Sequence, residues 1–226
     1  MARRPRVVLP GFAHHVTHRG NRKEAIFLDD QDRRFYLSKL AKYTREYDIL
    51  LYGYALMTTH VHHVAVPATK DALSLCFHDL HGTYADHFNT KYGVTGHLFE
   101  ERFYACALDE AHLWNAIRYV EQNAVRAKMV QAAEDYHWSS AQAHCGLKND
   151  LLLAPDFPPP GVIMNWREWL ATGLSELELE QLRSATLKGI PCASVALLRE
   201  LEASLGIPML PRKRGRPPSR RVHFAG

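Results

Sequence analysis

The chain of 226 residues is 46% hydrophobic and carries a formal net charge of +4, which suits one packed domain with room for an appendage. No apolar run approaches the roughly 18 residues of a membrane-spanning helix, the basic N-terminus has no apolar signal-peptide segment, and the four widely spaced cysteines indicate neither a zinc ribbon nor a disulfide framework. These exclusions favour a cytoplasmic protein.

Hydrophobic periodicity predicts the elements of the first 130 residues, because alternation is typical of strands and a 3.6-residue repeat is typical of helices. In chain order they are a strand at 12–21, a helix at 29–48, strands at 49–57 and 60–67, a helix at 71–93, a strand at 101–109 and a helix at 110–130. The first six match the split βαβ pattern of the ferredoxin-like fold. We therefore expect an α+β protein in which two helices cover one face of an antiparallel sheet, while the third helix lies against the other face or an edge.

The second part of the chain differs in composition. Residues 151–161 hold four of the twelve prolines, which indicates a boundary, and helical patterns follow before a strongly basic end. We expect a folded domain over 1–148, a proline-rich linker over 149–170, a helical extension over 171–210 and a basic tail over 211–226.

The positive charge lies at the two ends of the chain. Residues 211–226 carry six Lys or Arg and no acid, residues 1–6 carry three Arg and no acid, and the rest holds 19 basic against 24 acidic residues. Basic arms of this kind are common in nucleic-acid-binding proteins, although a solubilising tail has the same composition.

Three histidines interrupt the apolar strand at 60–67. Because alternate residues of a strand project from the same face, His60 and His62 point together and His63 points to the opposite face. Two imidazoles on one face of a sheet can chelate a divalent cation. Two surface histidines that bind no metal remain the alternative.

A second pattern lies in the helix at 110–130. Tyr119 and Asn123 are four residues apart and therefore share a helix face. A tyrosine hydroxyl can act as a nucleophile where a metal polarises its target, and the Asn123 amide oxygen could complete the ligand set. Taken alone, a tyrosine on an amphipathic helix is more often part of the core.

These patterns occur within longer segments whose order matches that of one known family. The segments are YALMTTHVHHVAV (54–66), YVEQNAVRA (119–127), THRGNRKEAIF (17–27), GHLFEERFYA (96–105), YHWSS (136–140) and KRGRPP (213–218). Through them nearly the whole chain resembles the REP-associated tyrosine transposases, which are single-tyrosine members of the HUH endonucleases.

The sequence departs from the family pattern at three places. Ala124 stands where the family usually has proline, so the helix is expected to run on further than usual. His63 stands where leucine is customary, and on a core-facing side it needs a hydrogen-bond partner or a path to solvent. Thr58 and Thr59 replace Pro-Asn in the turn before His60.

The resemblance implies a metal-dependent endonuclease and strand transferase that acts on single-stranded DNA and REP-type hairpins, with residues 1–148 as the catalytic domain. Tyr119 is the implied nucleophile, which forms a 5′-phosphotyrosine intermediate. His60, His62 and Asn123 are the expected ligands of Mg²⁺ or Mn²⁺, since availability favours Mg²⁺ and imidazole ligands favour Mn²⁺. We also expect a bacterial, nucleoid-associated protein, and a monomer is favoured over a dimer.

DNA contacts are expected at the end of the first strand and in the tail, where R-G-R-P resembles an AT-hook core that can enter a narrow minor groove. The candidate DNA-binding residues are Arg19, Asn21, Arg22, Arg212, Lys213, Arg214 and Arg216. A solvated turn after the first strand and a non-specific phosphate clamp in the tail are the alternatives.

Two other classes of function remain open. A catalytically silent DNA-binding or regulatory protein of the same fold would use the histidines structurally. A 2H-type phosphoesterase needs two separated H-x-[ST] motifs; HVT at 15–17 supplies one, but HVH at 60–62 does not supply the second.

Overall fold

The computed structural model describes residues 6–209, which fall into two compact units. The first unit ends at Ala193 and the second begins at Ser194. In the second unit, helix α8 (Val195–Leu205) is capped at its start by the Ser194 hydroxyl and ends at Gly206, which has φ 66°. No helix among the described residues is both long and apolar enough to cross a membrane.

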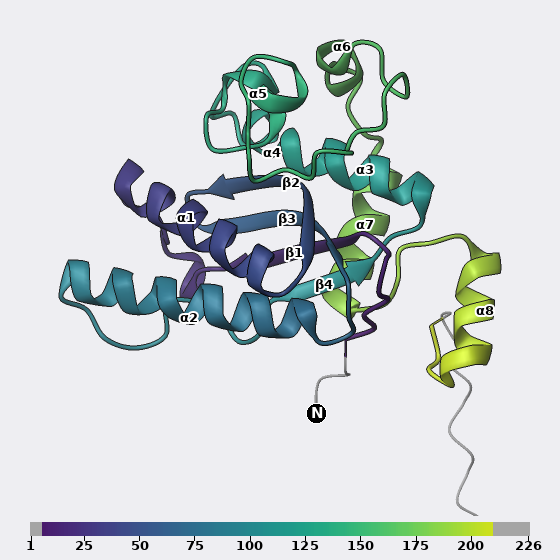
Figure 1. Cartoon of the computed structure of the whole chain (residues 1–226), viewed down its shortest axis with the longest axis horizontal. Coiled ribbons are helices and arrows are strands. Elements are labelled where there is room, and N and C mark those ends of the chain that lie inside the picture. Colours follow the sequence, from purple (N-terminus) through teal and green to yellow (C-terminus); the bar gives the residue numbers. More distant parts are fainter. Residues whose placement is uncertain (1–5, 210–226) are drawn as a thin grey trace, which may run out of the picture. The chain divides into compact units, whose positions relative to one another are not determined.

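A four-stranded antiparallel sheet runs through the first unit (Figure 1), with its strands in the order β2-β3-β1-β4. The strands are β1 (His14–Arg19), β2 (Ile49–Met57), β3 (His60–Pro67) and β4 (Tyr104–Ala107). This order, with the helices between the strands, is the ferredoxin-like fold that the sequence predicts. The two histidine-bearing strands, β1 and β3, lie side by side in the middle of the sheet, where Thr17 pairs with His62 and Arg19 with His60.

Helices α1 (Asp30–Glu46) and α2 (Ala72–Tyr92) cover one face of the sheet (Figure 1). The start of α1 is closed by a capping box in which the Asp29 side chain accepts from the Asp32 amide, and α2 ends at Gly93 in the left-handed conformation. Aliphatic and aromatic side chains fill the layer between the sheet and these helices. They include Val16, Tyr36, Leu40, Leu56, Val61, Phe77 and Leu80.

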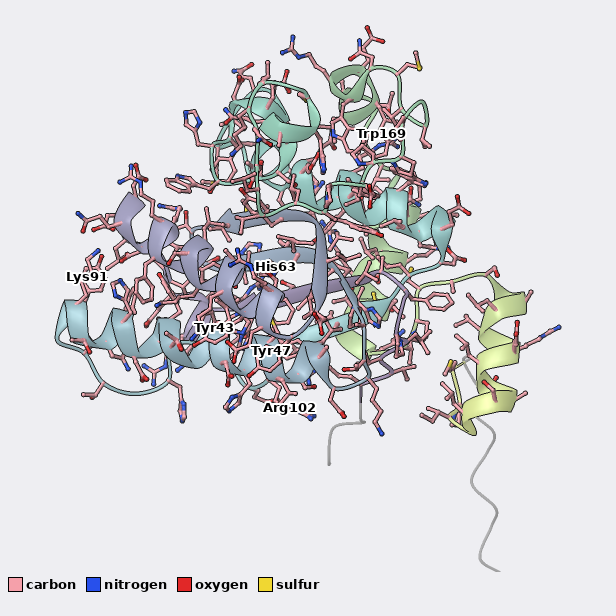
Figure 2. All side chains as sticks on the ribbon, viewed as in Figure 1. Tyr43, Tyr47, His63, Lys91, Arg102 and Trp169 are labelled. Carbon is pink, nitrogen blue, oxygen red and sulfur yellow. The ribbon has the colours of Figure 1, made fainter. Side chains whose placement is uncertain are left out.

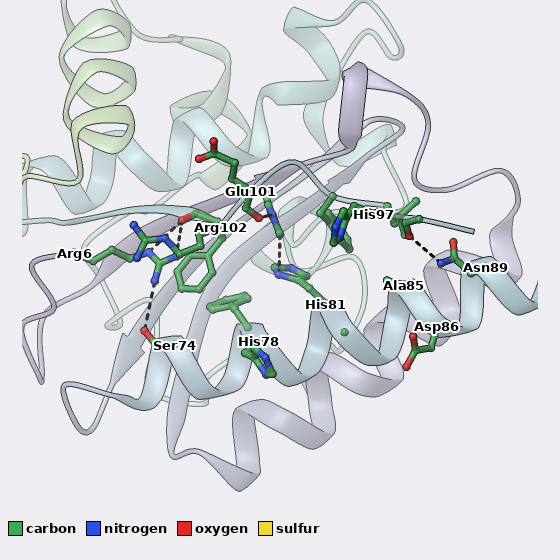
Figure 3. Close-up of a pocket in the computed structure, with 17 residues that line it drawn as sticks. Arg6, Ser74, His78, His81, Ala85, Asp86, Asn89, His97, Glu101 and Arg102 are labelled. Atoms are coloured by element: carbon green, nitrogen blue, oxygen red, sulfur yellow. Dashed lines mark hydrogen bonds between the residues drawn. The ribbon is translucent and has the colours of Figure 1, made fainter. Parts of the chain in front are cut away.

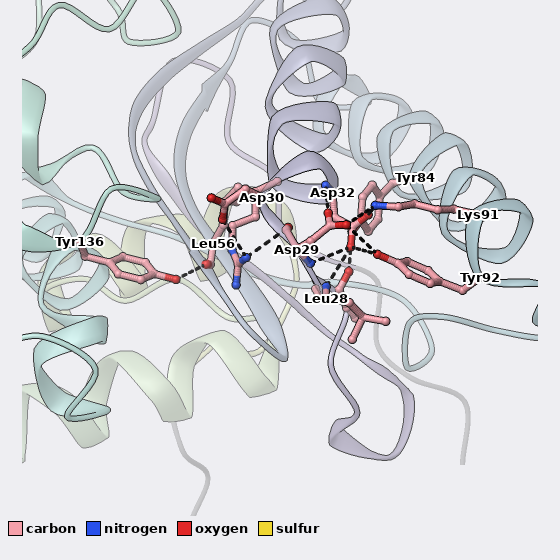
Figure 4. A network of polar contacts seen from close by, with 11 residues as sticks. Leu28, Asp29, Asp30, Asp32, Leu56, Tyr84, Lys91, Tyr92 and Tyr136 are labelled. Atoms are coloured by element: carbon pink, nitrogen blue, oxygen red, sulfur yellow. Dashed lines mark hydrogen bonds and ion pairs between the residues drawn. The ribbon is translucent and has the colours of Figure 1, made fainter.

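A buried carboxylate joins the start of α1 to the end of α2 (Figure 4). Asp32 is fully buried and accepts hydrogen bonds from Lys91 Nζ and Tyr92 Oη, both at 2.8 Å. Burial by itself would raise the pKa of Asp32, but the hydrogen bonds from Lys91, the Leu28 amide and Tyr92 outweigh it and hold the pKa below its usual value. Asp32 therefore stays ionised at neutral pH and fastens the two helices together.

The opposite face of the sheet is covered by α3 (Glu110–Glu121), α4 (Asn123–Arg126) and α7 (Glu176–Lys188). The third predicted helix thus lies against the other face. Gly53 of β2 allows this close approach, because a Cβ at that position would lie 3.1 Å from Ile117 Cδ1 and 3.2 Å from Ser140 Oγ.

The predicted helix at 110–130 is shorter in the structure, and the expectation that it runs on past Asn123 is wrong. Helix α3 ends at Glu121, Gln122 is its C-cap, and α4 begins at Asn123 and ends at Arg126. A continuous helix would offer the Tyr119 carbonyl to the Asn123 amide, but this carbonyl accepts from the Arg126 guanidinium instead. The side chain of Arg126 therefore stabilises the break that separates Tyr119 from Asn123.

The segment expected to be a linker is packed into the first unit. Phe157 is buried and stacks on Tyr52 with ring centroids 4.1 Å apart, and the buried Trp166 indole N–H donates to Glu121 at 2.8 Å. The unit continues through α7 to Ala193, so the structural boundary lies well beyond residue 148. Prolines indicated a boundary, but the aromatic side chains among them supply enough apolar surface to join the core.

Short helices complete the first unit. They are η1 (Asn21–Lys23), η2 (Ala133–Asp135), α5 (Ala141–His144) and α6 (Trp166–Ala171). Glu121 at the end of α3 is fully buried and accepts from Ser140 Oγ at 2.5 Å and from His144 Nδ1 at 2.6 Å. These bonds hold the end of α3, and with it Tyr119, against the segments that follow.

Candidate active site

A cavity of about 270 Å³ lies on the α3 and α7 side of the sheet. Strand alternation turns every second residue of β1 and β3 toward it, α3 contributes a tyrosine, and α7 supplies the remaining wall. The residues that line it are His15, Thr17, Arg19, His60, His62, Glu100, Tyr104, Tyr119, Arg183, Thr186 and Leu187.

The two predicted histidines face this cavity together. The ring centroids of His60 and His62 are 4.9 Å apart, with the planes nearly perpendicular at 84°. His63 lies on the opposite face among the side chains of α1 and α2 (Figure 2), where its Nε2 is 3.3 Å from Tyr36 Oη. The predicted assignment of the strand faces is therefore confirmed, and His63 has the hydrogen-bond partner that its burial requires.

Tyr119 of α3 lies against these histidines. Its side chain is buried, and its ring centroid is 5.4 Å from that of His62 and 5.5 Å from that of His15, with edge-to-face geometry in both pairs. The structure thus brings together the residues that the sequence predicted as nucleophile and as metal-ligand pair, although they come from separate elements.

Two arginines flank the tyrosine. The guanidinium carbon of Arg126 lies 4.3 Å from the centroid of the Tyr119 ring, and that of Arg183 lies 5.7 Å from it. Arg126 Nη1 is buried and has no hydrogen-bond partner among residues 6–209. Fixed positive charge at this place stabilises an anionic phosphate.

Burial keeps the histidines of the site neutral. Burial, together with the positive charge of Arg19, lowers the pKa of His60 to about 4. Burial, with a smaller effect of Arg126, lowers the pKa of His15 to about 3, and burial holds the pKa of His62 well below its usual value. A neutral imidazole is the form that binds a metal ion.

The donor atoms fit a divalent cation. His62 Nε2 is buried and finds no hydrogen-bond partner within the described part of the chain, and leaving such a nitrogen unpaired costs free energy that a bound ligand would recover. His60 is oriented by Thr59, whose Oγ1 lies 3.0 Å from His60 Nδ1. In residues 6–209 no third His, Cys, Asp or Glu joins the pair as a metal-binding cluster.

Asn123, the predicted third ligand, lies at the first position of α4. Its side chain is buried, and its Nδ2 has no hydrogen-bond partner among residues 6–209. Asn123 is not one of the residues that line the cavity. Its role as a ligand stays a prediction.

The predicted DNA-binding residues fall into two groups. Arg19 is exposed at the end of β1 and lines the cavity, and Asn21 and Arg22 are exposed in η1, where Arg22 has φ 55°. The remaining candidates lie outside the described residues; they are Arg212, Lys213, Arg214 and Arg216.

Several residues of the site were not predicted from the sequence, among them His15, Arg126, Arg183 and Thr186. His15 follows from the same two-residue alternation that places Thr17 and Arg19, so the pattern that identified His60 and His62 could have found it. Arg126 lies seven residues after Tyr119, beyond the break between α3 and α4, so helical periodicity is only a weak signal for it. Arg183 and Thr186 come from α7, and no local pattern connects them to strands that precede them by well over a hundred residues.

A larger cavity of about 650 Å³ lies on the other side of the sheet, next to α2 (Figure 3). His81 and His97 line it, together with Arg102 and Phe99. Within it His18 Nδ1 is 2.9 Å from His81 Nδ1, and His18 stacks on Phe99 with centroids 4.4 Å apart. Tyr119 and the His60–His62 pair do not line this cavity, so its size does not make it the reactive centre.

The chain is similar to proteins of known family and known structure. The family model for IS200-like transposases matches residues 10–123. A solved structure of a REP-associated tyrosine transposase bound to a REP hairpin is similar with a TM-score of 0.52 and 17% sequence identity, over 66% of this chain and 89% of that chain. At this identity the likeness shows the fold. A putative transposase from Deinococcus radiodurans R1 matches with a TM-score of 0.38 and 14% identity, over 60% of this chain and 98% of that one. No curated protein matches the chain.

Proposed function

Because this chain belongs to the family of IS200-like transposases, we propose that it is a single-tyrosine strand transferase that cuts and rejoins single-stranded DNA next to a REP-type hairpin. The observation that carries the proposal is the position of Tyr119, which lies edge-on to the His62 ring and beneath the guanidinium groups of Arg126 and Arg183. This arrangement supplies a nucleophile, the positive charge of Arg183 and a metal-ligand pair in one cavity, with the positive charge of Arg126 against the Tyr119 ring.

Tyr119 acts as the nucleophile in this mechanism. Its Oη forms a bond to the scissile phosphorus, the bond from phosphorus to the 3′ oxygen breaks, and a 5′-phosphotyrosine and a free 3′-OH result. The phenolic proton passes to solvent, and the departing 3′ oxygen takes up a proton from solvent. Attack of another 3′-OH on the phosphotyrosine reverses the step and joins two strands.

The two arginines supply positive charge next to the reacting groups. Negative charge accumulates on the phosphate oxygens in the transition state, and fixed positive charge nearby stabilises it. Arg126 is held against the Tyr119 ring by its bond to the Tyr119 carbonyl and does not need to reorganise during the reaction. Its Nη1 is buried and has no hydrogen-bond partner among residues 6–209, so its charge is little screened by water.

His60 and His62, with Asn123 as the third protein ligand, would hold Mg²⁺ or Mn²⁺, and the imidazole ligands favour Mn²⁺. When bound, such an ion supplies Lewis-acid polarisation of the scissile phosphate. The neutral state of both imidazoles and the unpaired His62 Nε2 support this assignment.

Unpaired DNA suits the cavity better than a duplex. A volume of about 270 Å³ accommodates a phosphate with its sugar but not a double helix. Arg19 at the edge of the cavity could receive the neighbouring phosphate, and the exposed Asn21 and Arg22 extend this path. The REP hairpin bound by the similar structure supports a hairpin as the adjoining duplex part of the substrate.

The test is covalent capture. Labelled single-stranded DNA carrying a REP-type hairpin is incubated with the protein and Mn²⁺, and the product is separated in SDS. The wild-type protein should form an SDS-resistant adduct, and Tyr119→Phe should bind the hairpin without forming it. Tyr52→Phe is the matched control, because it keeps the ring that stacks 4.1 Å from Phe157, away from the cavity. An adduct in Tyr119→Phe would refute the assignment of the nucleophile, and hairpin binding with no adduct from the wild type would favour a catalytically silent DNA-binding protein.

A further inference from the structure

A buried row of hydrogen bonds links helix α7 to the metal-ligand pair. Thr186 Oγ1 is 2.7 Å from the Leu182 carbonyl oxygen of the preceding helical turn and 2.8 Å from His15 Nδ1. His15 Nε2 is in turn 2.9 Å from His62 Nδ1. Thr186, His15 and His62 are each at most 4% exposed, so water does not compete for these bonds.

The hydroxyl group of Thr186 decides which atom donates and which accepts in each hydrogen bond of this row. We assign the single hydroxyl proton of Thr186 to Leu182 O, which can only accept and is the nearer partner, because a threonine inside a helix commonly donates to the carbonyl of the preceding turn. Thr186 Oγ1 must therefore accept from His15, which places the His15 proton on Nδ1. The other ring nitrogen of neutral His15, Nε2, can then only accept, and His62 must donate to it from Nδ1.

The surroundings of the row agree with this direction. The second lone pair of Thr186 Oγ1 is available to the Cys106 thiol, whose Sγ lies 3.2 Å away. The rings of His15 and His62 are nearly parallel, at 12°, with centroids 5.1 Å apart. This centroid distance is too large for face-to-face stacking. It is the distance expected when two imidazole rings lie nearly in one plane and are joined by an N–H···N hydrogen bond.

We propose that Thr186 and His15 are positioning residues that hold His62 in the Nδ1–H tautomer and so aim the Nε2 lone pair at a divalent cation. The unpaired, buried Nε2 of His62 is the atom that this tautomer leaves free. The hydrogen bond that a metal-binding histidine donates from its other ring nitrogen sets its tautomer and its ring orientation. That the cation is the one used for DNA cleavage rests on the proposed function, whereas the tautomer does not.

Helix α7 is thereby part of the proposed active site. Thr186 lies beyond residues 10–123, which the family model matches, in a helix that packs on β4, β1 and α3. The C-terminal part of the first unit therefore contributes to metal binding through one hydroxyl group, in addition to closing the cavity wall with Arg183 and Leu187.

The tautomer can be observed directly in the metal-free, full-length protein. Two-bond ¹⁵N–¹H correlation spectra of ¹⁵N-histidine-labelled protein at pH 7.5 distinguish Nδ1–H from Nε2–H, and loss of one signal set in His62→Gln assigns His62. We expect the Nδ1–H tautomer for both His62 and His15 in the wild type. A proton on Nε2 of His62 would overturn the proposal without the need for any variant of Thr186.

Variants of Thr186 test the link to the metal. Thr186→Val keeps the shape but removes the hydroxyl, and Mn²⁺ affinity measured by calorimetry should fall about 10- to 100-fold, with His62 no longer confined to one tautomer. Thr186→Ser restores the hydroxyl and should restore both readouts. Thr44→Val is the matched control, because Thr44 is a buried threonine that donates to the Leu40 carbonyl at 2.8 Å in the same way but lies in α1.

The outcomes separate this proposal from the proposed function. Unchanged Mn²⁺ affinity and an unchanged His62 tautomer in folded Thr186→Val would refute the positioning role. If the wild type forms no covalent adduct with DNA but shows the Nδ1–H tautomer and Thr186-dependent Mn²⁺ binding, the positioning role holds and the strand-transfer function fails.

Discussion

Replacing Arg126 by methionine tests whether the positive charge of the guanidinium group beside the Tyr119 ring accelerates the reaction. Arg126→Met keeps an unbranched side chain of similar length and removes a guanidinium group 4.3 Å from the tyrosine ring. One preorganised donor to a developing negative charge contributes about 2.7–4 kcal/mol in enzymes, which corresponds to a factor of 10²–10³ in rate. Because Arg183 remains, we expect the lower end, a decrease of about 100-fold in the rate of adduct formation.

The two arginines should differ in magnitude because they differ in exposure. Arg183 is exposed and 5.7 Å from the ring, where water screens its charge, and a pair of charges 4 Å apart in bulk water interacts by only about 1 kcal/mol. Arg183→Met should therefore slow adduct formation by no more than about tenfold, since tenfold corresponds to about 1.4 kcal/mol. The partly buried Arg126 is screened less.

Single-turnover adduct formation with saturating hairpin DNA measures the chemical step apart from binding. Arg118→Met is the matched control: the Arg118 guanidinium also lies over an aromatic ring, 4.2 Å from the centroid of Trp169, and donates to the Gly173 carbonyl at 2.9 Å. Both variants lose a cation–π contact and a capped carbonyl, but only Arg126 touches Tyr119. Equal rates in Arg126→Met and the wild type, or an equal loss in Arg118→Met, would refute the electrostatic argument.

Three further predictions concern the metal pair, the helix junction and the tail. His62→Ala should abolish metal-dependent cleavage, whereas His63→Leu should keep it because His63 faces the other layer; loss of cleavage in a folded His63→Leu protein would contradict the assignment of faces. Asp32→Asn should lower the free energy of unfolding in urea by about 1–3 kcal/mol at pH 7. Since the pKa of Asp32 is held below its unfolded value, this contribution is present above about pH 4 and is lost as the pH falls through the folded pKa, so the difference between the two proteins should shrink steadily as the pH falls below 4; a difference that does not shrink with pH would show a packing effect. Deletion of residues 211–226 should flatten the log–log salt dependence of hairpin binding by about 2–3, if half of the six cations each release a counterion, and an unchanged slope would place binding elsewhere.

Local pattern predicted the fold and the central part of the site. Two-residue alternation placed His60 and His62 on one face and His63 on the other, and the structure has the same faces. The order of strands and helices predicted the ferredoxin-like sheet, with β2 and β3 beginning and ending at the predicted residues. These features follow from sequence because they depend on the periods of strand and helix, which neighbouring residues set.

The end of α3 shows where local pattern failed. The composition of residues 110–130 favours a continuous helix, and nothing among neighbouring residues predicts a stop at Glu121. The end of the helix is stabilised by two side-chain interactions. The Arg126 guanidinium donates to the Tyr119 carbonyl, and the buried Glu121 carboxylate is hydrogen-bonded to Ser140 and His144. Rotamers and partners of this kind are selected by packing, which periodicity does not report.

The sequence by itself determined the family resemblance and the sheet, and it predicted the tyrosine and the histidine pair of the candidate site. Only the tertiary structure decided which groups surround them. His15 is separated from Thr186 by 171 residues, yet their side chains are hydrogen-bonded at 2.8 Å because α7 folds back onto the sheet. The reason is physical: backbone periodicity is a local property, whereas the direction of a proton in a buried row of hydrogen bonds depends on atoms that meet only after the chain has packed.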